Sequence, residues 1–179
     1  MLEQMTQRLQ AQRSFEAAVE TLLNDVVALH GAEYGDLQLL VGDELVLVAQ
    51  RGLSLPFLRA FRRVTRADGC ACGRALREGR TVVVADVTSD PGYAAFRDEA
   101  TVAGYRAVQS TPLATGRGRV LGMVSTLFAN VHEPTPIELD TLTRYSRVAA
   151  DYLEALLGAA PLAAQAQRMH AALYADAVA

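Results

Sequence analysis

The sequence predicts an α+β fold in which a mostly antiparallel sheet carries helices on its faces. The order of the predicted elements does not alternate strand and helix, as parallel βαβ units do. Two pairs of branched-rich segments are joined by short turns, as in β-hairpins. Apolar residues at both ends of the chain recur at three- and four-residue steps, which is typical of amphipathic helices. With 179 residues, 51% of them hydrophobic, we expect one globular domain with one core.

The first half of the chain is predicted to form a helix, a hairpin and two short helices. These elements lie at residues 2–30 (helix), 36–41 and 44–50 (strands), and 55–63 and 72–79 (short helices). Gly31 would end the first helix, and Gly42 with Asp43 gives the hairpin a two-residue turn. Pro56 near the start of one short helix and Gly79 at the end of the other mark their boundaries.

The second half of the chain is predicted to contain three strands and three helices. They lie at residues 81–86, 106–113 and 120–128 (strands) and 94–103, 136–157 and 162–178 (helices). Thr135, Pro136 and Glu138 form a capping box with proline at the first helical position, so a helix begins there. Gly158 and Pro161 interrupt it. We expect a core domain, an N-terminal extension of the first helix and a C-terminal alanine-rich helix or tail, over residues 14–157, 1–13 and 158–179.

Charge and apolar patterning exclude several classes of partner. The formal net charge is −3 at pH 7, so the chain lacks the basic field that collects phosphates, and we expect no contact with nucleic acid. No apolar run approaches the roughly 20 residues needed to span a bilayer, and the N-terminus lacks an apolar signal-peptide core. We therefore expect a cytoplasmic protein without membrane association.

Three motifs between residues 68 and 128 carry a family resemblance. They are G-x-x-C-G-R-A-L, V-x-D-V-x-x-D-P-x-Y, and the strand pair G-Y-R-A-V-Q-S-T-P-L followed by G-x-x-L-G-M-x-S. Together they resemble GAF domains, in particular a bacterial signalling group that occurs alone or joined to PAS and histidine kinase modules. The likeness covers about residues 14–157. It implies a profilin/PAS-like sheet with the terminal helices on one face and, on the other, a pocket covered by loops and short helices.

Strand alternation and the resemblance together define a candidate ligand pocket. Val108 and Ser110 share one face of their strand, and Met123 and Ser125 share one face of the next. On the opposite face, Gly122 would let the terminal helices approach closely. The resemblance assigns to the pocket and its lid Phe57, Phe61, Cys70, Cys72, Asp86, Tyr93, Phe96, Tyr105, Val108, Ser110, Met123 and Ser125. The alternative is that the aromatic side chains simply fill the core.

Cys70 and Cys72 are the only cysteines of the chain, and three interpretations of them stay open. They can be small buried hydrophobes, a strained and easily reduced local disulfide, or reactive thiols. The start of the following helix and the nearby Arg74 and Arg77 would favour a thiolate. A metal site is not expected, because no second Cys or His pair lies in sequence reach.

The differences from other GAF classes narrow the range of possible ligands. The chain lacks the asparagine-lysine pair of cyclic-nucleotide-binding GAF domains. It also has no histidine between His30 and His132, which argues against a covalent bilin or an imidazole-bound haem. Apart from the two cysteines, no Ser/His/Asp, P-loop or paired-carboxylate pattern indicates a catalytic site, and the sequence identifies no cofactor.

The sequence therefore favours a sensory GAF module that binds a small molecule or senses thiol state. Leu2 to Leu9 extend the apolar stripe beyond what one sheet can cover, so we expect a homodimer through the N- and C-terminal helices. Its output would go to a histidine kinase or another signalling partner. Two alternatives are kept: a reductase of free methionine sulfoxide that uses Cys70 and Cys72, with Asp86 or Asp98 as acidic residues, and a purely structural dimerisation module.

Overall fold

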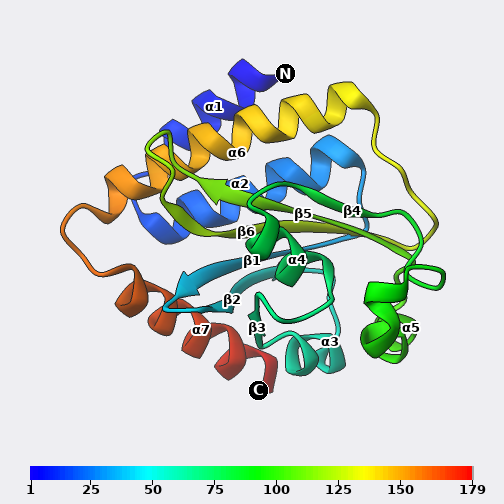
Figure 1. The fold of residues 1–179 in the computed structure, drawn as a ribbon. Helices are drawn as coiled ribbons and strands as arrows, with labels where there is room; N and C mark the ends of the chain where they lie inside the picture. The colour runs from blue at the N-terminus through cyan, green and yellow to red at the C-terminus, as the bar shows by residue number, and fades with distance from the viewer. Residues whose placement is uncertain (179) are drawn as a thin grey trace.

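Six antiparallel strands form one curled sheet in the computed structural model, which describes residues 1–178 (Figure 1). The order across the sheet is β3-β2-β1-β6-β5-β4. The strands are β1 (Tyr34–Val41), β2 (Glu44–Arg51), β3 (Arg63–Thr65), β4 (Val82–Val84), β5 (Ala107–Ala114) and β6 (Val120–Phe128). Both predicted hairpins are present, and the predicted α+β class is confirmed.

Glycines in left-handed backbone conformation shape the two hairpins. Gly42 has φ 61° in the turn between β1 and β2, and Gly118 has φ 83° in the turn between β5 and β6. β1 also pairs with β6, so the two hairpins lie side by side at the centre of the sheet.

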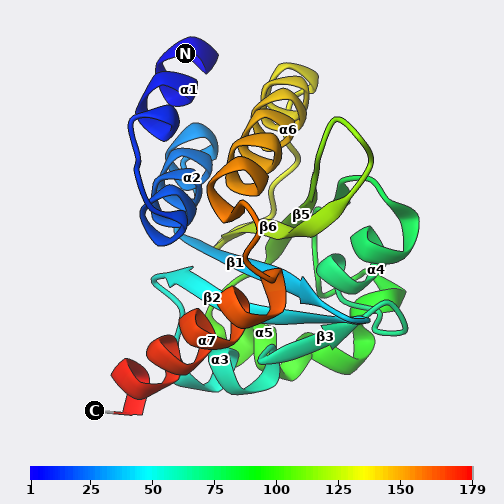
Figure 2. The ribbon, with the colours of Figure 1, turned by 90° about the vertical axis from the view of Figure 1, so that its left-hand side faces the viewer.

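One face of the sheet is covered by α1 (Leu2–Gln10), α2 (Phe15–His30) and α6 (Pro136–Leu157) (Figure 2). The predicted capping box is present at the start of α6. The Glu138 backbone N–H donates to Thr135 Oγ1 over 3.3 Å, and the Thr135 N–H donates to a Glu138 carboxylate oxygen over 2.7 Å. Leucines and valines of these helices and of the sheet form one buried core cluster.

The predicted single helix over residues 2–30 is wrong, because the chain breaks between α1 and α2. Ser14 caps α2 by accepting from the backbone N–H of Ala17 at 3.2 Å. α1 folds back, with Met5 and Leu9 buried in the core cluster that contains α6. The apolar stripe from Leu2 to Leu9, from which a dimer partner was inferred, is therefore covered by other parts of the same chain.

The last helix, α7 (Leu162–Val178), lies along the edge of β2 beyond the short strand β3. The Leu47 carbonyl of β2 is 2.7 Å from His170 Nδ1, and the Tyr174 hydroxyl donates to the Leu58 carbonyl. Leu162 packs in the core cluster on the α2 face, whereas Leu173 packs against the cluster on the other face. α7 thus joins the two layers at one edge of the sheet.

The second face of the sheet carries α3 (Leu55–Ala60), α4 (Ala71–Glu78), the 3₁₀ helix η1 (Pro91–Phe96) and α5 (Arg97–Ala103). We call these four segments and the loops between them the lid. The predicted helix 55–63 ends at Ala60, and residues 63–65 instead form the edge strand β3. The predicted helix 94–103 is divided between η1 and α5, because Asp90 and Pro91 start a helical turn earlier.

The role predicted for Gly122 is also wrong. A Cβ atom on Gly122 would collide with the Gln38 carbonyl oxygen of β1, so this glycine lets two strands approach each other. The glycine beneath a terminal helix is Gly35, where a Cβ would meet Val27 and Leu23 of α2. Within residues 1–178, no helix combines the length and the hydropathy that crossing a bilayer requires.

Candidate functional site

A small closed cavity lies between the sheet and the lid. Its volume is about 10 Å³, which is room for about one water molecule. It is lined by Asp36, Gln38, Phe57, Phe61, Ala71, Cys72, Tyr93, Val108, Ser110, Ser125 and Leu127. The lining residues come from β1, β5 and β6 on the sheet side and from α3, α4 and η1 on the lid side. The cavity is therefore closed only as long as the lid stays in place.

Most residues that the resemblance assigned to a pocket are brought together here. Seven of them line the cavity: Phe57, Phe61, Cys72, Tyr93, Val108, Ser110 and Ser125. Cys70, Tyr105 and Met123 are buried in the same cluster of side chains, and Phe96 packs against it. Asp86 does not reach the cavity. Its carboxylate accepts from the Thr88 hydroxyl and lies in an ion pair with Arg106, and the bonds from Thr88 hold its pKa below the ordinary value.

Aromatic rings form the lid side of the cavity. Phe57 and Phe61 stack with ring centroids 4.4 Å apart, and Phe61 stacks on Phe96 at 5.4 Å. The hydroxyls of Tyr93 and Tyr105 are 2.8 Å apart and form a buried hydrogen bond. These contacts connect α3, η1 and the segment before β5, so the lid is packed as one unit.

The two cysteines face each other at the start of α4. Their sulfur atoms are 3.5 Å apart, and both side chains are buried. The hydrogen bond from the Cys72 thiol lowers the pKa of Cys70, and a backbone N–H of Gly73 acts in the same direction. The pKa of Cys72 is raised, because it donates that hydrogen bond and is buried close to Asp36. Cys70 is accordingly the thiol that ionises first.

Ser110 and Ser125 form a polar pair on the floor of the cavity. The two residues lie opposite each other in the β5/β6 register, and their hydroxyl oxygens are 2.8 Å apart. This pair agrees with the predicted orientation of the two strands.

Sequence reasoning missed two polar residues of β1, Asp36 and Gln38, which face the same cavity. Asp36 lies opposite Ser125 in the sheet register and is only 4% exposed. Its Oδ1 atom has no hydrogen-bond partner, and burial raises its pKa to about 7. The Gln38 side-chain nitrogen donates to the Phe61 carbonyl at 3.4 Å, but its Oε1 atom has no donor. Two polar residues in alternation within an apolar strand were the signal that could have identified them.

Two close contacts join segments of the lid to one another. The Arg74 guanidinium of α4 pairs with the Asp90 carboxylate before η1, with nitrogen–oxygen distances of 3.2 Å. The backbones of Gly69 and Gly92 pass so close that a Cβ on Gly69 would collide with the Gly92 carbonyl. The Arg74–Asp90 ion pair and the close approach of Gly69 and Gly92 thus add to the aromatic contacts that hold the lid together.

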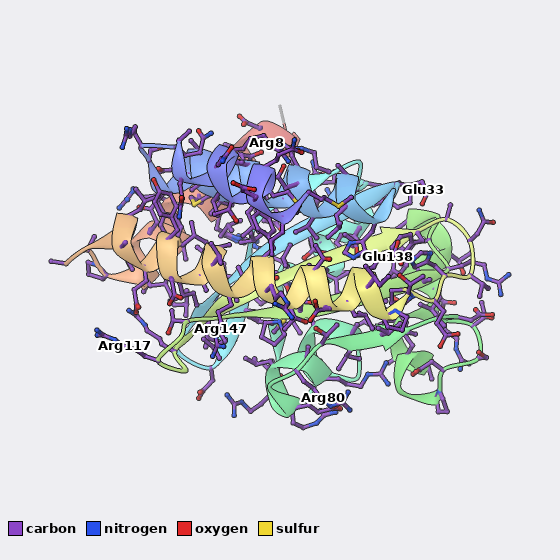
Figure 3. All side chains as sticks on the ribbon, turned by 90° about the horizontal axis from the view of Figure 1, so that it is seen from above. Arg8, Glu33, Arg80, Arg117, Glu138 and Arg147 are labelled. Atoms are coloured by element: carbon purple, nitrogen blue, oxygen red, sulfur yellow. The ribbon has the colours of Figure 1, made fainter. Side chains whose placement is uncertain are left out.

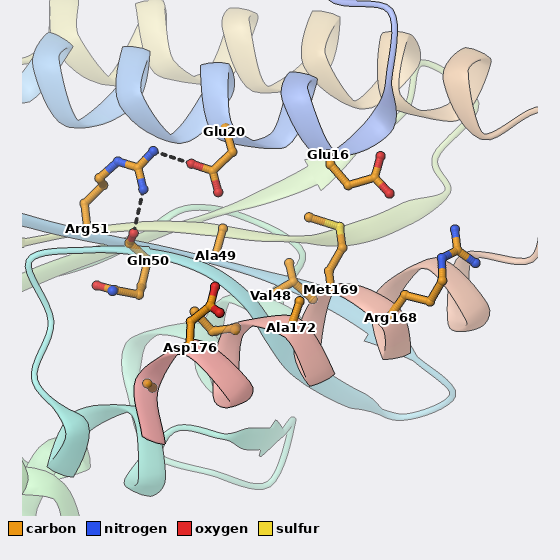
Figure 4. Close-up of a pocket in the computed structure, with 12 residues that line it drawn as sticks. Glu16, Glu20, Val48, Ala49, Gln50, Arg51, Arg168, Met169, Ala172 and Asp176 are labelled. Atoms are coloured by element: carbon orange, nitrogen blue, oxygen red, sulfur yellow. Dashed lines mark hydrogen bonds and ion pairs between the residues drawn. The ribbon is translucent and has the colours of Figure 1, made fainter. Parts of the chain in front are cut away.

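Larger grooves lie on the outer surface, away from this cavity. One of about 620 Å³ runs between α2 and α7 over β2, where Arg51 pairs with Glu20 (Figure 4). A second of about 790 Å³ lies between β4 and α6, flanked by Arg80 and Arg147 (Figure 3). Neither contains a buried polar atom that lacks a partner. In the described part of the chain, no group of three or more His, Cys, Asp or Glu side chains is placed to hold a metal ion.

Comparisons with known proteins agree with this architecture. Residues 12–154 match the family model described as GAF domain. A search of curated protein sequences finds no match. Among solved structures, the chain is similar to free methionine-R-sulfoxide reductase from Neisseria meningitidis in complex with its substrate. The identity is 23%, 87% of each chain is covered, and the TM-score is 0.68.

Two other solved structures are also similar to the chain. One is the GAF domain of a phosphoenolpyruvate-protein phosphotransferase from Coxiella burnetii, with 21% identity, 95% of this chain and 94% of that chain covered, and a TM-score of 0.67. The other is a domain assigned to a two-component sensor histidine kinase from Sinorhizobium meliloti, with 20% identity, 92% and 99% coverage, and a TM-score of 0.64. At these identities the likeness shows a shared fold.

Proposed function

The chain belongs to the GAF domain family, and from that premise we propose that it is a sensory module whose lid responds to a small molecule bound in the cavity over the sheet. The GAF fold is a signalling fold, and its structural neighbours here include a phosphotransferase domain and a sensor kinase domain. In this proposal the ligand binds in the cavity, the lid moves, and the signal leaves through the helical face of the sheet.

The observation that carries the proposal is the chemistry of the cavity. Buried polar groups are almost always hydrogen-bonded, because an unpaired one costs about 1–3 kcal/mol. Asp36 and Gln38 each keep an oxygen unpaired in the same small space, beneath a lid held by the Arg74–Asp90 pair. An apolar lining with a few convergent polar groups is the usual form of a small-ligand site.

The output would pass through β5 and β6 to the helical face. Ser110 and Ser125 face the cavity, whereas α6 packs on the other side of β5. A ligand that displaces the lid would change the packing contacts between the lid and these strands, and would thereby shift α6. We place the protein in the cytoplasm as a homodimer that contacts a histidine kinase or another signalling partner. The dimer seam would use the outer face of α6, where Ile137 is 79% exposed, because the α1 stripe is already covered.

The test uses two adjacent substitutions on β6 that point to opposite faces. Ser125→Leu fills the cavity, and Thr126→Leu introduces the same side chain on the helical face, where Thr126 is equally buried. We expect compounds from a cell extract that raise the melting temperature of the wild type to lose this effect in Ser125→Leu and to keep it in Thr126→Leu. Loss of the effect in both variants, or in neither, would place the ligand elsewhere.

A second candidate function rests on the two thiols 3.5 Å apart and on the likeness to a methionine sulfoxide reductase. In that reaction the sulfoxide oxygen and the two thiol hydrogens leave as water, and the cysteine sulfurs join in a disulfide that an external thiol reduces. Formation of free methionine from its R-sulfoxide with dithiothreitol, measured by chromatography and abolished in Cys72→Ser, would support this function. No turnover by the wild type would rule it out.

A further inference from the structure

We propose that the ligand of the cavity is a small primary amine in its protonated form, which donates to Asp36 and Gln38 and packs its carbon chain against Phe57 and Phe61. This inference rests on the proposed function, because it names the chemistry of the ligand at the same site. It follows from the charge, the hydrogen-bonding capacity and the walls of the cavity.

The negative charge of the Asp36 carboxylate favours a cationic ligand. Asp36 is 4% exposed and its Oδ1 atom is unpaired. The titratable groups near Asp36 are the Cys72 thiol and the phenols of Tyr93, Tyr105 and Tyr174, none of which can carry a positive charge. No arginine or histidine lines the cavity, and the chain contains no lysine. A buried carboxylate without a cation is strongly unfavourable, so a cationic ligand supplies what the protein lacks.

The hydrogen-bonding capacity of the site selects among cations. Gln38 lies two residues after Asp36 on β1 and presents a second unpaired oxygen to the same cavity. Both atoms accept hydrogen bonds, and the Ser110–Ser125 pair beside them adds hydroxyl oxygens. An ammonium group carries three N–H donors, whereas a quaternary ammonium carries none. The acceptors therefore favour a primary amine.

The walls of the cavity define the rest of the ligand. The stacked rings of Phe57 and Phe61 and the ring of Tyr93 offer an apolar surface whose faces attract cations. No basic side chain is available to pair with a carboxylate, which disfavours amino acids and other acids as ligands. Since the closed cavity has room for only about one water molecule, the amine is bound with the lid displaced outward, which requires the Arg74–Asp90 pair to separate or shift.

The experiment measures binding of three primary amines of increasing size, ethylamine, isobutylamine and phenethylamine, each paired with the alcohol of the same skeleton. Isobutyrate serves as the anionic control. Calorimetry and thermal shift are run at pH 8, where Asp36, with its pKa of about 7, is mostly ionised. We expect at least one amine to bind, its alcohol to bind at least about tenfold more weakly, and isobutyrate not to bind.

Two variants test whether Asp36 contacts the amine. Asp36→Asn keeps the shape and removes the charge, and Asp43→Asn makes the same change in the exposed turn of the same hairpin. We expect Asp36→Asn to weaken amine binding about tenfold or more and Asp43→Asn to leave it within about twofold. Circular dichroism and thermal melting establish that both variants fold.

Each other outcome overturns a distinct claim. Equal binding of amine and alcohol, or amine binding that Asp36→Asn leaves unchanged, overturns the inference about the ligand and leaves the sensory proposal standing. Binding of only neutral or anionic extract compounds does the same. If no compound of the panel binds and native mass spectrometry finds no extract compound on the protein, both the inference and the proposed function fail.

Discussion

Arg74 and Asp90 form an ion pair that joins two segments of the lid. The guanidinium of Arg74 lies 3.2 Å from both carboxylate oxygens of Asp90, and both side chains are only about one-fifth exposed. Asp90 also caps η1 by accepting from the Tyr93 backbone N–H at 3.0 Å. One ion pair therefore connects α4, which carries the cysteines, to η1, which carries a cavity-lining tyrosine.

Removal of this pair should loosen the lid more than the sheet. Arg74→Ala is expected to increase amide hydrogen exchange in α4 and η1, with a loss of global stability of about 1 kcal/mol. Arg80→Ala, which breaks an exposed pair with Glu78, is the matched control and should leave exchange in η1 unchanged. Equal protection of the lid in wild type and Arg74→Ala would show that the pair does not hold the lid.

The buried Asp36 carboxyl should make stability fall as pH rises. Its pKa is raised to about 7 in the folded protein, against about 3.9 in an unfolded chain. The folded state then binds more protons at Asp36 between these values, so the contribution of this residue to stability is greatest below about pH 4 and is lost as the pH rises to about 7, by about 4 kcal/mol at most. Asp36→Asn should be more stable than wild type at pH 8, and the difference between the two proteins should shrink towards pH 5. Urea titrations at several pH values measure this difference, and one that does not vary with pH would contradict the account.

The two cysteines should differ in reactivity although both are buried. The thiol–thiol hydrogen bond lowers the pKa of Cys70 and raises that of Cys72, and the thiolate is the reactive form. In the wild type, where this hydrogen bond is intact, we expect Cys70 to react with iodoacetamide at pH 7.5 before Cys72. Partial alkylation followed by peptide mapping gives the rate at each cysteine. Faster alkylation of Cys72 would reverse the assignment.

A buried polar contact should anchor α1 and α2 to α6. The Tyr145 hydroxyl donates to Asp25 over 2.6 Å, and Arg8 of α1 donates to the other oxygen of the same carboxylate over 2.7 Å. Because Asp25 is 8% exposed, Tyr145→Phe is expected to cost about 2 kcal/mol.

Tyr152→Phe provides the comparison for that substitution. Its hydroxyl donates to the backbone carbonyls of Gln10 and Gln12, which are neutral acceptors near the surface, so its loss should cost about 1 kcal/mol or less. Chemical denaturation compares the two variants. A larger cost for Tyr152→Phe than for Tyr145→Phe would disprove the role given to Asp25.

The elements with strong local signals could be predicted from the sequence. The capping box of Thr135 and Glu138 and the alternation in β5 and β6 depend on neighbouring residues, and both are present in the structure. The family resemblance located the cavity face, which local patterns alone do not define. The break between α1 and α2 was missed, because the apolar spacing continues across residues 11–14 and only the packing of α1 on α6 decides the direction of the chain.

The part of the site that was missed depends on long-range geometry. Asp36 was assigned only to a strand, because nothing local distinguishes an aspartate facing solvent from one facing a closed cavity. Its environment is formed by β6, which pairs with β1, and by α3 and α4, which cover the cavity. The family resemblance assigned Asp86 to the lid, but Thr88 and Arg106 bind its carboxylate away from the cavity.

The most direct test of a ligand-sensing cavity is native mass spectrometry of the protein purified without reducing agent, followed by the denatured intact mass. The account predicts a protein that carries a non-covalent small molecule, lost in Ser125→Leu and kept in Thr126→Leu, with both cysteines as free thiols. The same spectrum reports whether the protein is a dimer. A ligand-free protein with a Cys70–Cys72 disulfide would contradict the account and direct attention to thiol chemistry instead.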